Sequence, residues 1–312
     1  MNNFKTYLAG GTLLLAAMTA MAKENPNFDY KVDRFADIEV LRYEVPGFDQ
    51  LTLKQKEMLY YLSEAAQWGR DIIWDQNGAN NLQLRRILEK IYQNFDGDRN
   101  SADWKGFEKY MKQVWFGNGP HHHYSNDKFK PEFSESFFAE RVGGLCNHCI
   151  GAADDREREA IIAEITKYIF DPAYLSKKVS LDSTGDVIAN SSVNMYDGVT
   201  QEEVEAYFAK IKKPNDPTPI SYGLNSKLVK DGDGNVVELH YSLNGLYGEA
   251  IRNIIYWLDK AKSVAENDAQ RAYITKLIDY YITGALRTFH EYSILWAAAT
   301  DSDQDFVNGY IE

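Results

Sequence analysis

Residues 83–95 read QLRRILEKIYQNF and carry apolar side chains at three- and four-residue spacing, namely Leu84, Ile87, Leu88, Ile91 and Phe95. In an α-helix this spacing places the apolar side chains on one face, one turn above another. The segment therefore predicts an amphipathic helix that buries one side.

Similar signals occur on both sides of this segment. Thr52 with Gln55, and Thr200 with Glu203, have the spacing of a capping box, in which each side chain bonds the other residue's backbone N–H. Ser101 can cap a helix that carries several aromatic residues, and acidic residues at 154–155 suit the start of another. Besides 83–95, helices are predicted near 52–73, 101–115, 154–169, 200–208, 248–266 and 268–300.

Two stretches favour strands instead. Residues 180–193 are rich in Val and Ser around a turn at 184–186, and residues 227–242 alternate on both sides of Asp231–Asn235 as a hairpin does. The hairpin tip has the D-x-D-x-N start of a calcium loop, but Val236 stands where such a loop needs Gly and Ser242 where it needs Glu. We predict a plain turn there. The fold class is α+β, predominantly helical with a small β part.

Composition limits the function. The chain has 312 residues, 44% of them hydrophobic, and a formal net charge of -12. A chain of this length can bury a hydrophobic core large enough to stabilise a fold. Binding to the phosphate backbone needs clustered Lys and Arg, so nucleic acid is not an expected partner. A soluble enzyme and a substrate-binding protein both fit this composition.

The first residues differ from the rest. Lys5 precedes a short apolar stretch, and Ala20-Met21-Ala22 has the small-x-small pattern of a signal peptidase site. We expect residues 1–22 to be a signal peptide, the alternative being a buried N-terminal helix. The mature chain, residues 23–312, is then exported, to a bacterial periplasm, with no membrane contact after signal cleavage.

The two cysteines, Cys146 and Cys149, form a C-x-x-C pair with Asn147 and His148 between them. Such a pair can be a redox site, half of a zinc site or a short-loop disulfide. A zinc knuckle needs a second pair, which the sequence lacks. A thioredoxin-like site needs a strand directly before it, where this chain has Val142-Gly143-Gly144. The pattern favours a structural or incidental role and leaves a redox or metal role open.

Histidines are concentrated in one loop. His121, His122 and His123 are consecutive, and an extended backbone would point His121 and His123 the same way, at a metal-chelating spacing. The alternative is a polar loop whose imidazoles contact ligand or backbone. His290-Glu291 starts like a zinc-binding H-E-x-x-H helix, but Ile294 and Leu295 stand where the second His would be. We predict no metal role for His290.

The stretch Trp115–Phe129 (WFGNGPHHHYSNDKF) resembles the bacterial branch of the dipeptidyl-peptidase III family, peptidase family M49. The chain end, Asp305–Glu312 (DFVNGYIE), is similar to a second block of that family. The order and spacing of the two blocks fit the family over residues 28–312.

The resemblance implies a two-lobed zinc exopeptidase that removes dipeptides from the N-termini of short peptides. It assigns substrate contacts to Glu312, Tyr124, His123 and Asn308. Glu312 would pair with the free amine of the peptide, and Tyr124 would line the cleft at the same end. Charge-assisted contacts of this kind are strong enough to fix where the peptide starts.

The family binds zinc through an H-E-x-x-x-H helix and a later Glu, and this sequence contains neither motif. The chain ends inside the second block. We therefore expect the N-terminal, lower-lobe part of such a peptidase, truncated before the catalytic helical lobe. It would have no catalytic residue and bind no zinc specifically, and it would be inactive alone. Two alternatives are a stand-alone exported peptide-binding protein and a metal enzyme built on His121 and His123.

Overall fold

The computed structural model describes residues 28–309, and the chain divides into two units at Leu51 and Thr52. The predicted signal peptide, residues 1–22, and the predicted amine-binding Glu312 lie outside the described residues. The first unit is an antiparallel hairpin of β1 (Lys31–Phe35) and β2 (Ile38–Leu41), followed by the 3-10 helix η1 (Phe48–Gln50).

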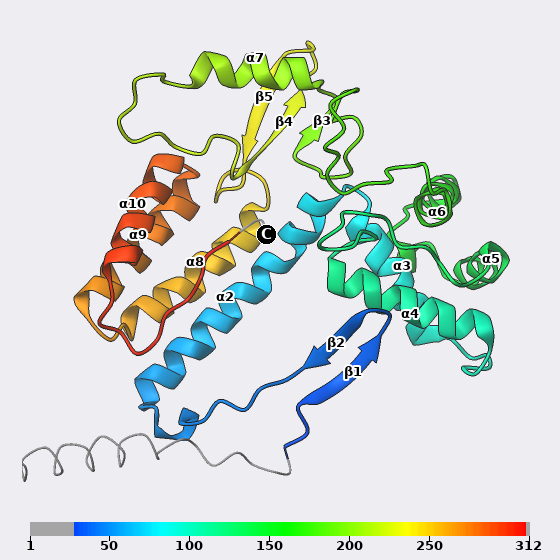
Figure 1. Ribbon diagram of the computed structural model, residues 1–312, viewed down its shortest axis with the longest axis horizontal. Coiled ribbons are helices and arrows are strands. Elements are labelled where there is room, and N and C mark those ends of the chain that lie inside the picture. Colours follow the sequence, from blue (N-terminus) through cyan, green and yellow to red (C-terminus); the bar gives the residue numbers. More distant parts are fainter. Residues whose placement is uncertain (1–27, 310–312) are drawn as a thin grey trace, which may run out of the picture. The chain divides into compact units, whose positions relative to one another are not determined.

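The second unit begins with α2 (Leu53–Asn77), a 25-residue helix that belongs to two hydrophobic clusters. The predicted capping box is confirmed, because the Gln55 N–H donates to Thr52 Oγ1 at 3.3 Å and the Thr52 N–H donates to Gln55 Oε1 at 2.9 Å. Trp74 near the C-terminal end of α2 packs into one cluster, while Met58 and Ala65 pack into the other. The two clusters are therefore linked by one continuous helix (Figure 1).

The first cluster is built by four further helices: α3 (Asn81–Asn94), α4 (Ala102–Gly117), α5 (Glu135–Gly143) and α6 (Asp155–Phe170). The helices predicted from residues 83–95, 101–115 and 154–169 are confirmed, and so is the buried face of Leu84, Ile87, Leu88 and Ile91. Between α5 and α6, Cys146 and Cys149 form a disulfide beside the 3-10 helix η2 (His148–Ile150).

Strand order in the larger sheet is β3 (Tyr196–Asp197), β4 (Ser226–Lys230) and β5 (Val236–His240), with β3 parallel and β5 antiparallel to β4. The predicted hairpin at 227–242 is confirmed. Its tip is a turn in which the Asp231 carboxylate accepts the N–H groups of Asp233 and Asn235, at 3.0 and 2.8 Å. The helix α7 (Gln201–Ile211) begins at the predicted capping box and buries Val204 against Leu228 of the sheet.

The strand prediction for residues 180–193 is wrong, because this segment is a series of turns. Its own polar side chains bond the backbone and compete with sheet formation. Asp186 Oδ1 accepts the N–H groups of Ile188 and Ala189 at 2.9 and 3.0 Å, and Ser191 Oγ accepts the N–H of Ser180 at 2.8 Å.

The second cluster is formed by α2 with α8 (Gly248–Ser263), α9 (Asp268–Thr283) and α10 (Leu286–Ala298). The prediction of one helix over 268–300 is wrong. The helix ends at Gly284, whose φ of 69° is left-handed, and α10 turns back along α9 (Figure 1). Glycine adopts this conformation without the clash that a Cβ brings, so it ends helices readily.

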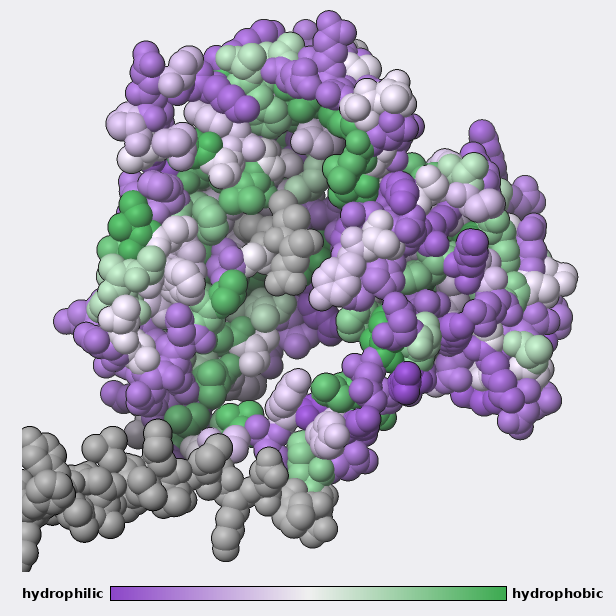
Figure 2. Space-filling model, viewed as in Figure 1, coloured by the Kyte–Doolittle hydropathy of each residue, from purple (hydrophilic) through white to green (hydrophobic). Residues whose placement is uncertain are grey.

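The predominantly helical fold with small sheets is therefore as predicted. In Figure 2, apolar residues show on the viewed surface along α2 and the helices beside it, among polar side chains. Over residues 28–309, the helices are too short or too polar to cross a bilayer.

Candidate functional site

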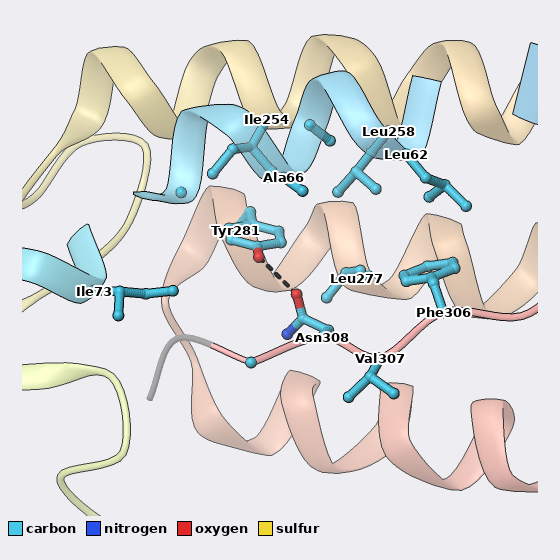
Figure 3. Close-up of a pocket in the computed structure, with 13 residues that line it drawn as sticks. Leu62, Ala66, Ile73, Ile254, Leu258, Leu277, Tyr281, Phe306, Val307 and Asn308 are labelled. Carbon is cyan, nitrogen blue, oxygen red and sulfur yellow. Dashed lines mark hydrogen bonds between the residues drawn. The ribbon is translucent and has the colours of Figure 1, made fainter. Parts of the chain in front are cut away.

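An apolar pocket lies where three helices of the second cluster meet the chain segment that follows α10 (Figure 3). Its volume is about 250 Å³. The helices α2, α8 and α9 contribute Leu62, Ala65, Ala66, Gly69, Ile73, Ile254, Leu258, Leu277 and Tyr281, and the segment contributes residues 306–309. The predicted second block, Asp305–Glu312, thus begins at the wall of a pocket.

Hydrogen bonds fix the segment after α10 against the helices. The indole N–H of Trp296 donates to Asp305 Oδ1 at 2.8 Å and to the carbonyl of Phe306 at 3.1 Å. The side-chain amide of Gln270, which is 1% exposed, donates to the carbonyl of Gln304 at 2.9 Å. Because these donors come from α9 and α10, the segment is positioned by the helical core.

Side chains of the segment alternate between two sides, as in a strand. Phe306 packs against the second cluster, whereas Val307 is 84% exposed. Asn308 is half-buried and lines the pocket again. Figure 3 shows the side chains of Phe306 and Asn308 on one side of the segment and the side chain of Val307 on the other.

Asn308 is held in a defined orientation by one strong contact. The hydroxyl of Tyr281 donates to Asn308 Oδ1 at 2.6 Å (Figure 3). Within residues 28–309, the buried Nδ2 group of Asn308 has no hydrogen-bond partner. A buried amide without a partner costs free energy that an incoming acceptor can recover. The pocket therefore combines an apolar wall with an amide donor that a ligand carbonyl can use.

The histidine loop between α4 and α5 belongs to the other cluster. Its first histidine, His121, is 2% exposed and forms an isolated bridge with Lys128. Nε2 of His121 lies 2.8 Å from the carbonyl of Leu175, and Nδ1 lies 3.4 Å from Ser192 Oγ. Burial lowers the pKa of His121 to about 4, so the imidazole is neutral at pH 7. Both ring nitrogens have neighbours that suit a structural role.

The next residues of the loop are more accessible. The ring of His123 is half-buried and lies 4.9 Å from Phe116, 4.5 Å from His122 and 4.1 Å from Tyr124, measured between ring centroids. The side chain of Tyr124 is 84% exposed. These aromatic rings form a surface that a ligand can contact.

The predicted substrate-binding residues thus stand beside different cores. Tyr124 and His123 contact the ring of His122, which lies 6.1 Å from Phe129 of the first cluster. Asn308 follows Phe306, which packs against the second cluster. Glu312 lies outside the described residues. Their common role stays a prediction.

Zinc does not fit the residues that the structure describes. Over residues 28–309, His, Cys, Asp and Glu form no group of three that could hold a metal ion. His290 lies half-buried on α10, and its neighbour Glu291 forms an ion pair with Lys276 of α9 at 3.1 Å. The H-E pair therefore stands in an ordinary helix–helix contact.

The pocket and the role of Tyr281 were not predicted from the sequence. A signal was present, because Tyr273, Leu277, Tyr280 and Tyr281 recur at three- and four-residue spacing on α9 and are all buried. A face with three tyrosines places hydroxyls inside a core, where they need partners. Which partner each one finds depends on the packing.

Comparison with known proteins supports the predicted relationship. The model of peptidase family M49 matches residues 183–312, a range that includes the second block and every helix that lines the pocket except α2. The predicted resemblance to peptidase family M49 is thereby confirmed over residues 183–312. No curated protein matches the chain.

Two solved structures of dipeptidyl-peptidase III are similar to the chain. The enzyme from Caldithrix abyssi is 17% identical with a TM-score of 0.48, and the alignment covers 82% of this chain and 35% of that one. The enzyme from Corallococcus sp. strain EGB is 15% identical with a TM-score of 0.49, covering 88% and 36%. The chain thus spans about a third of the length of these enzymes.

Proposed function

We propose that this chain supplies the part of a zinc-dependent dipeptidyl peptidase that binds the amino-terminal end of a short peptide. The family match over residues 183–312 supports the class of enzyme. The observation that carries the proposal is Asn308, whose Oδ1 is held by Tyr281 and whose Nδ2 is left available beside an apolar pocket.

The chemistry of the pocket suits the first residues of a peptide. The Nδ2 group of Asn308 donates to a main-chain carbonyl of the peptide, and the apolar wall takes a side chain. Glu312, four residues further along, pairs with the peptide ammonium group in this proposal. The ammonium group distinguishes the N-terminus of a peptide from an internal peptide bond. A carboxylate that binds this group therefore fixes the distance from the N-terminus to the bond that is cleaved.

The histidine loop contributes to the same ligand. In the proposal, the exposed ring of Tyr124 packs on the peptide, and the His123 ring beneath it supports that position through the 4.1 Å ring contact. Aromatic side chains offer a large contact area with little loss of conformational freedom on binding.

We do not expect this chain to hydrolyse peptides by itself. The family's zinc motif, H-E-x-x-x-H, does not occur in the sequence. Zinc bound by that motif supplies the activated water of such peptidases. We propose that the isolated chain binds peptides and does not cleave them.

Catalysis is tested directly with the purified chain. Incubation with zinc and a chromogenic dipeptide amide is expected to release no chromophore. Zinc-dependent turnover, lost again with a chelator, would contradict the proposed inactivity of the isolated chain.

Binding is tested by calorimetry with a short apolar peptide and with the same peptide acetylated at its N-terminus. Asn308→Ala is expected to weaken binding about tenfold, since one hydrogen bond to a buried amide is lost. Tyr281→Phe is expected to weaken it by a smaller factor, because Asn308 loses its fixed orientation. Acetylation removes the ammonium charge and should abolish most of the affinity.

Val307→Ala is the matched control, because Val307 neighbours Asn308 and its side chain is 84% exposed, on the side of the segment opposite Asn308 (Figure 3). It should bind like the unchanged protein. Equal affinities of the Asn308 and Val307 variants would rule out this pocket as the peptide site.

A stand-alone exported peptide-binding protein is the second candidate. It is favoured by the fact that α2, α8, α9 and residues 306–309 complete the pocket within one chain. This candidate predicts cooperative thermal unfolding with a midpoint that rises as peptide is added. A part that needs a further lobe should instead be poorly soluble alone, because apolar surface is left uncovered.

Export to a bacterial periplasm is also proposed, on the signal-peptide pattern of residues 1–22. Expression of the whole chain in a Gram-negative host should give a periplasmic product that starts near Lys23. An uncleaved cytoplasmic product would contradict it.

A further inference from the structure

The C-x-x-C pair lies between α5 and α6 beside the first cluster, whereas the helices that line the pocket belong to the second cluster. The two sulfur-bearing residues differ in their surroundings. Cys146 is exposed, whereas Cys149 is half-buried and packs against the first hydrophobic cluster. An external thiol can therefore approach the sulfur of Cys146 more easily than that of Cys149.

The turn is held by contacts that do not need the disulfide. The guanidinium of Arg158 donates to the carbonyls of Val142 and Gly143, both at 3.0 Å. The side-chain amide of Asn147 donates to Asp155 at 2.8 Å, and the carbonyl of Asn147 accepts the N–H of Ala152 at 2.9 Å. The turn therefore keeps its shape when the sulfurs are reduced, and the sulfurs stay close together.

The disulfide itself adds little restraint, because it joins residues only three positions apart. The stabilisation that a cross-link gives through loop closure grows with the length of the loop. A bond within one short turn is thus a poor structural staple. Exposed disulfides of this kind are the ones that exchange most readily with external thiols.

A backbone donor also distinguishes the two sulfurs. The N–H of Cys149 points at Sγ of Cys146 across 3.1 Å. A hydrogen bond to a sulfur favours its thiolate form over the neutral thiol. In the reduced chain, this contact favours Cys146 as the thiolate that faces solvent.

We propose that Cys146 and Cys149 form a thiol–disulfide exchange site for small thiols of the glutathione class, with Cys146 as the exchanging sulfur and Cys149 as the resolving one. An external thiolate attacks Sγ of Cys146, the bond between the two cysteines breaks, and Cys149 leaves as a thiolate that takes a proton from water. In reverse, the Cys149 thiolate attacks Cys146 and expels the external thiolate. A second external thiol completes reduction by releasing the external disulfide and leaving both cysteines as thiols.

The first test uses the whole oxidised chain under native conditions. Excess reduced glutathione is expected to open the disulfide, as measured by alkylation and mass spectrometry, with the thermal midpoint shifting by only a few degrees. A disulfide that resists glutathione until the protein is unfolded would overturn the proposal. Loss of cooperative unfolding on reduction would overturn it too, because the bond would then be a structural staple.

The second test assigns the sulfurs. With oxidised glutathione, Cys149→Ser is expected to form one mixed disulfide at Cys146, and Cys146→Ser to form one at Cys149 at least about tenfold more slowly. Equal rates would overturn the assignment. In the reduced unchanged protein, a single equivalent of alkylating reagent should label Cys146 first, and preferential labelling of Cys149 would be equally decisive against it. That measurement needs no substitution and does not depend on how well the variants fold.

Discussion

Asn81 connects helix α3 to the loop that carries His123 and Tyr124. Its side chain is fully buried at the start of α3. The amide Nδ2 donates to the carbonyl of Asn118 at 3.0 Å, and Oδ1 accepts the hydroxyl of Tyr168 on α6 at 2.9 Å. One amide therefore ties α3, α6 and the first turn of the loop together.

Asn81→Ala removes both hydrogen bonds and leaves their partners in a buried place. Each lost bond, with the desolvation of the partner left behind, costs about 1 to 2 kcal/mol. The free energy of unfolding should therefore fall by about 2 to 4 kcal/mol. Urea denaturation followed by fluorescence should show a lower midpoint with an unchanged slope.

Asn94→Ala is the control, because Asn94 is exposed at the other end of the same helix and its side-chain amide donates to the carbonyl of Lys90, one turn back on that helix, at 2.8 Å. It should change stability by less than about 0.5 kcal/mol. Tyr168→Phe, alone and combined with Asn81→Ala, should give a coupling energy of about 1 kcal/mol. A loss no larger for Asn81→Ala than for Asn94→Ala would refute the argument that this amide holds the loop.

Three further predictions concern local features. Burial lowers the pKa of His121 from 6.5 to about 4. Below pH 6.5 the unfolded chain therefore binds a proton that the folded chain does not bind, so the free energy of unfolding decreases as the pH falls toward 4. The loss between pH 7 and pH 5 should be about 2 kcal/mol in urea titrations, and His121→Gln should lack it; an identical pH slope in the variant would contradict this. Gly284→Ala should lower the free energy of unfolding by about 1 to 2 kcal/mol, because φ is 69° and an added Cβ would lie 3.1 Å from Ser242 Cβ. Calorimetry checks it, and an unchanged midpoint would show that the turn tolerates a side chain. Thr200→Ala should lower the free energy of unfolding by about 1 kcal/mol, because α7 loses its cap; thermal unfolding checks it, and an unchanged midpoint would contradict it.

Helix positions were predictable because their signals are local. The Thr52–Gln55 and Thr200–Glu203 boxes lie within four residues of chain, and each was found where the spacing placed it. The errors also have local causes. The helix α9 ends at Gly284 and α10 begins at Leu286, and the spacing of apolar residues hardly changes across this break. Periodicity alone therefore does not reveal that the chain reverses direction there.

The segment 180–193 shows a second kind of error. Its Val and Ser content is typical of strands, yet Asp186 and Ser191 bond nearby backbone groups and satisfy them without a neighbouring strand. The composition of this segment favours a strand, but the hydrogen bonds of its own side chains stabilise turns instead.

Periodicity, caps and motif blocks are properties of short stretches, so they were enough to predict the helical class, the buried face of α3 and the resemblance to peptidase family M49. The packing of whole helices, by contrast, brings Leu62 of α2, Leu258 of α8 and Asn308 to the wall of one pocket, which required the three-dimensional structure to see. Only that structure showed that the hydroxyl of Tyr281 orients Asn308 and leaves Nδ2 available. Such contacts join residues far apart in the chain, and they depend on how whole helices pack, which local spacing does not encode.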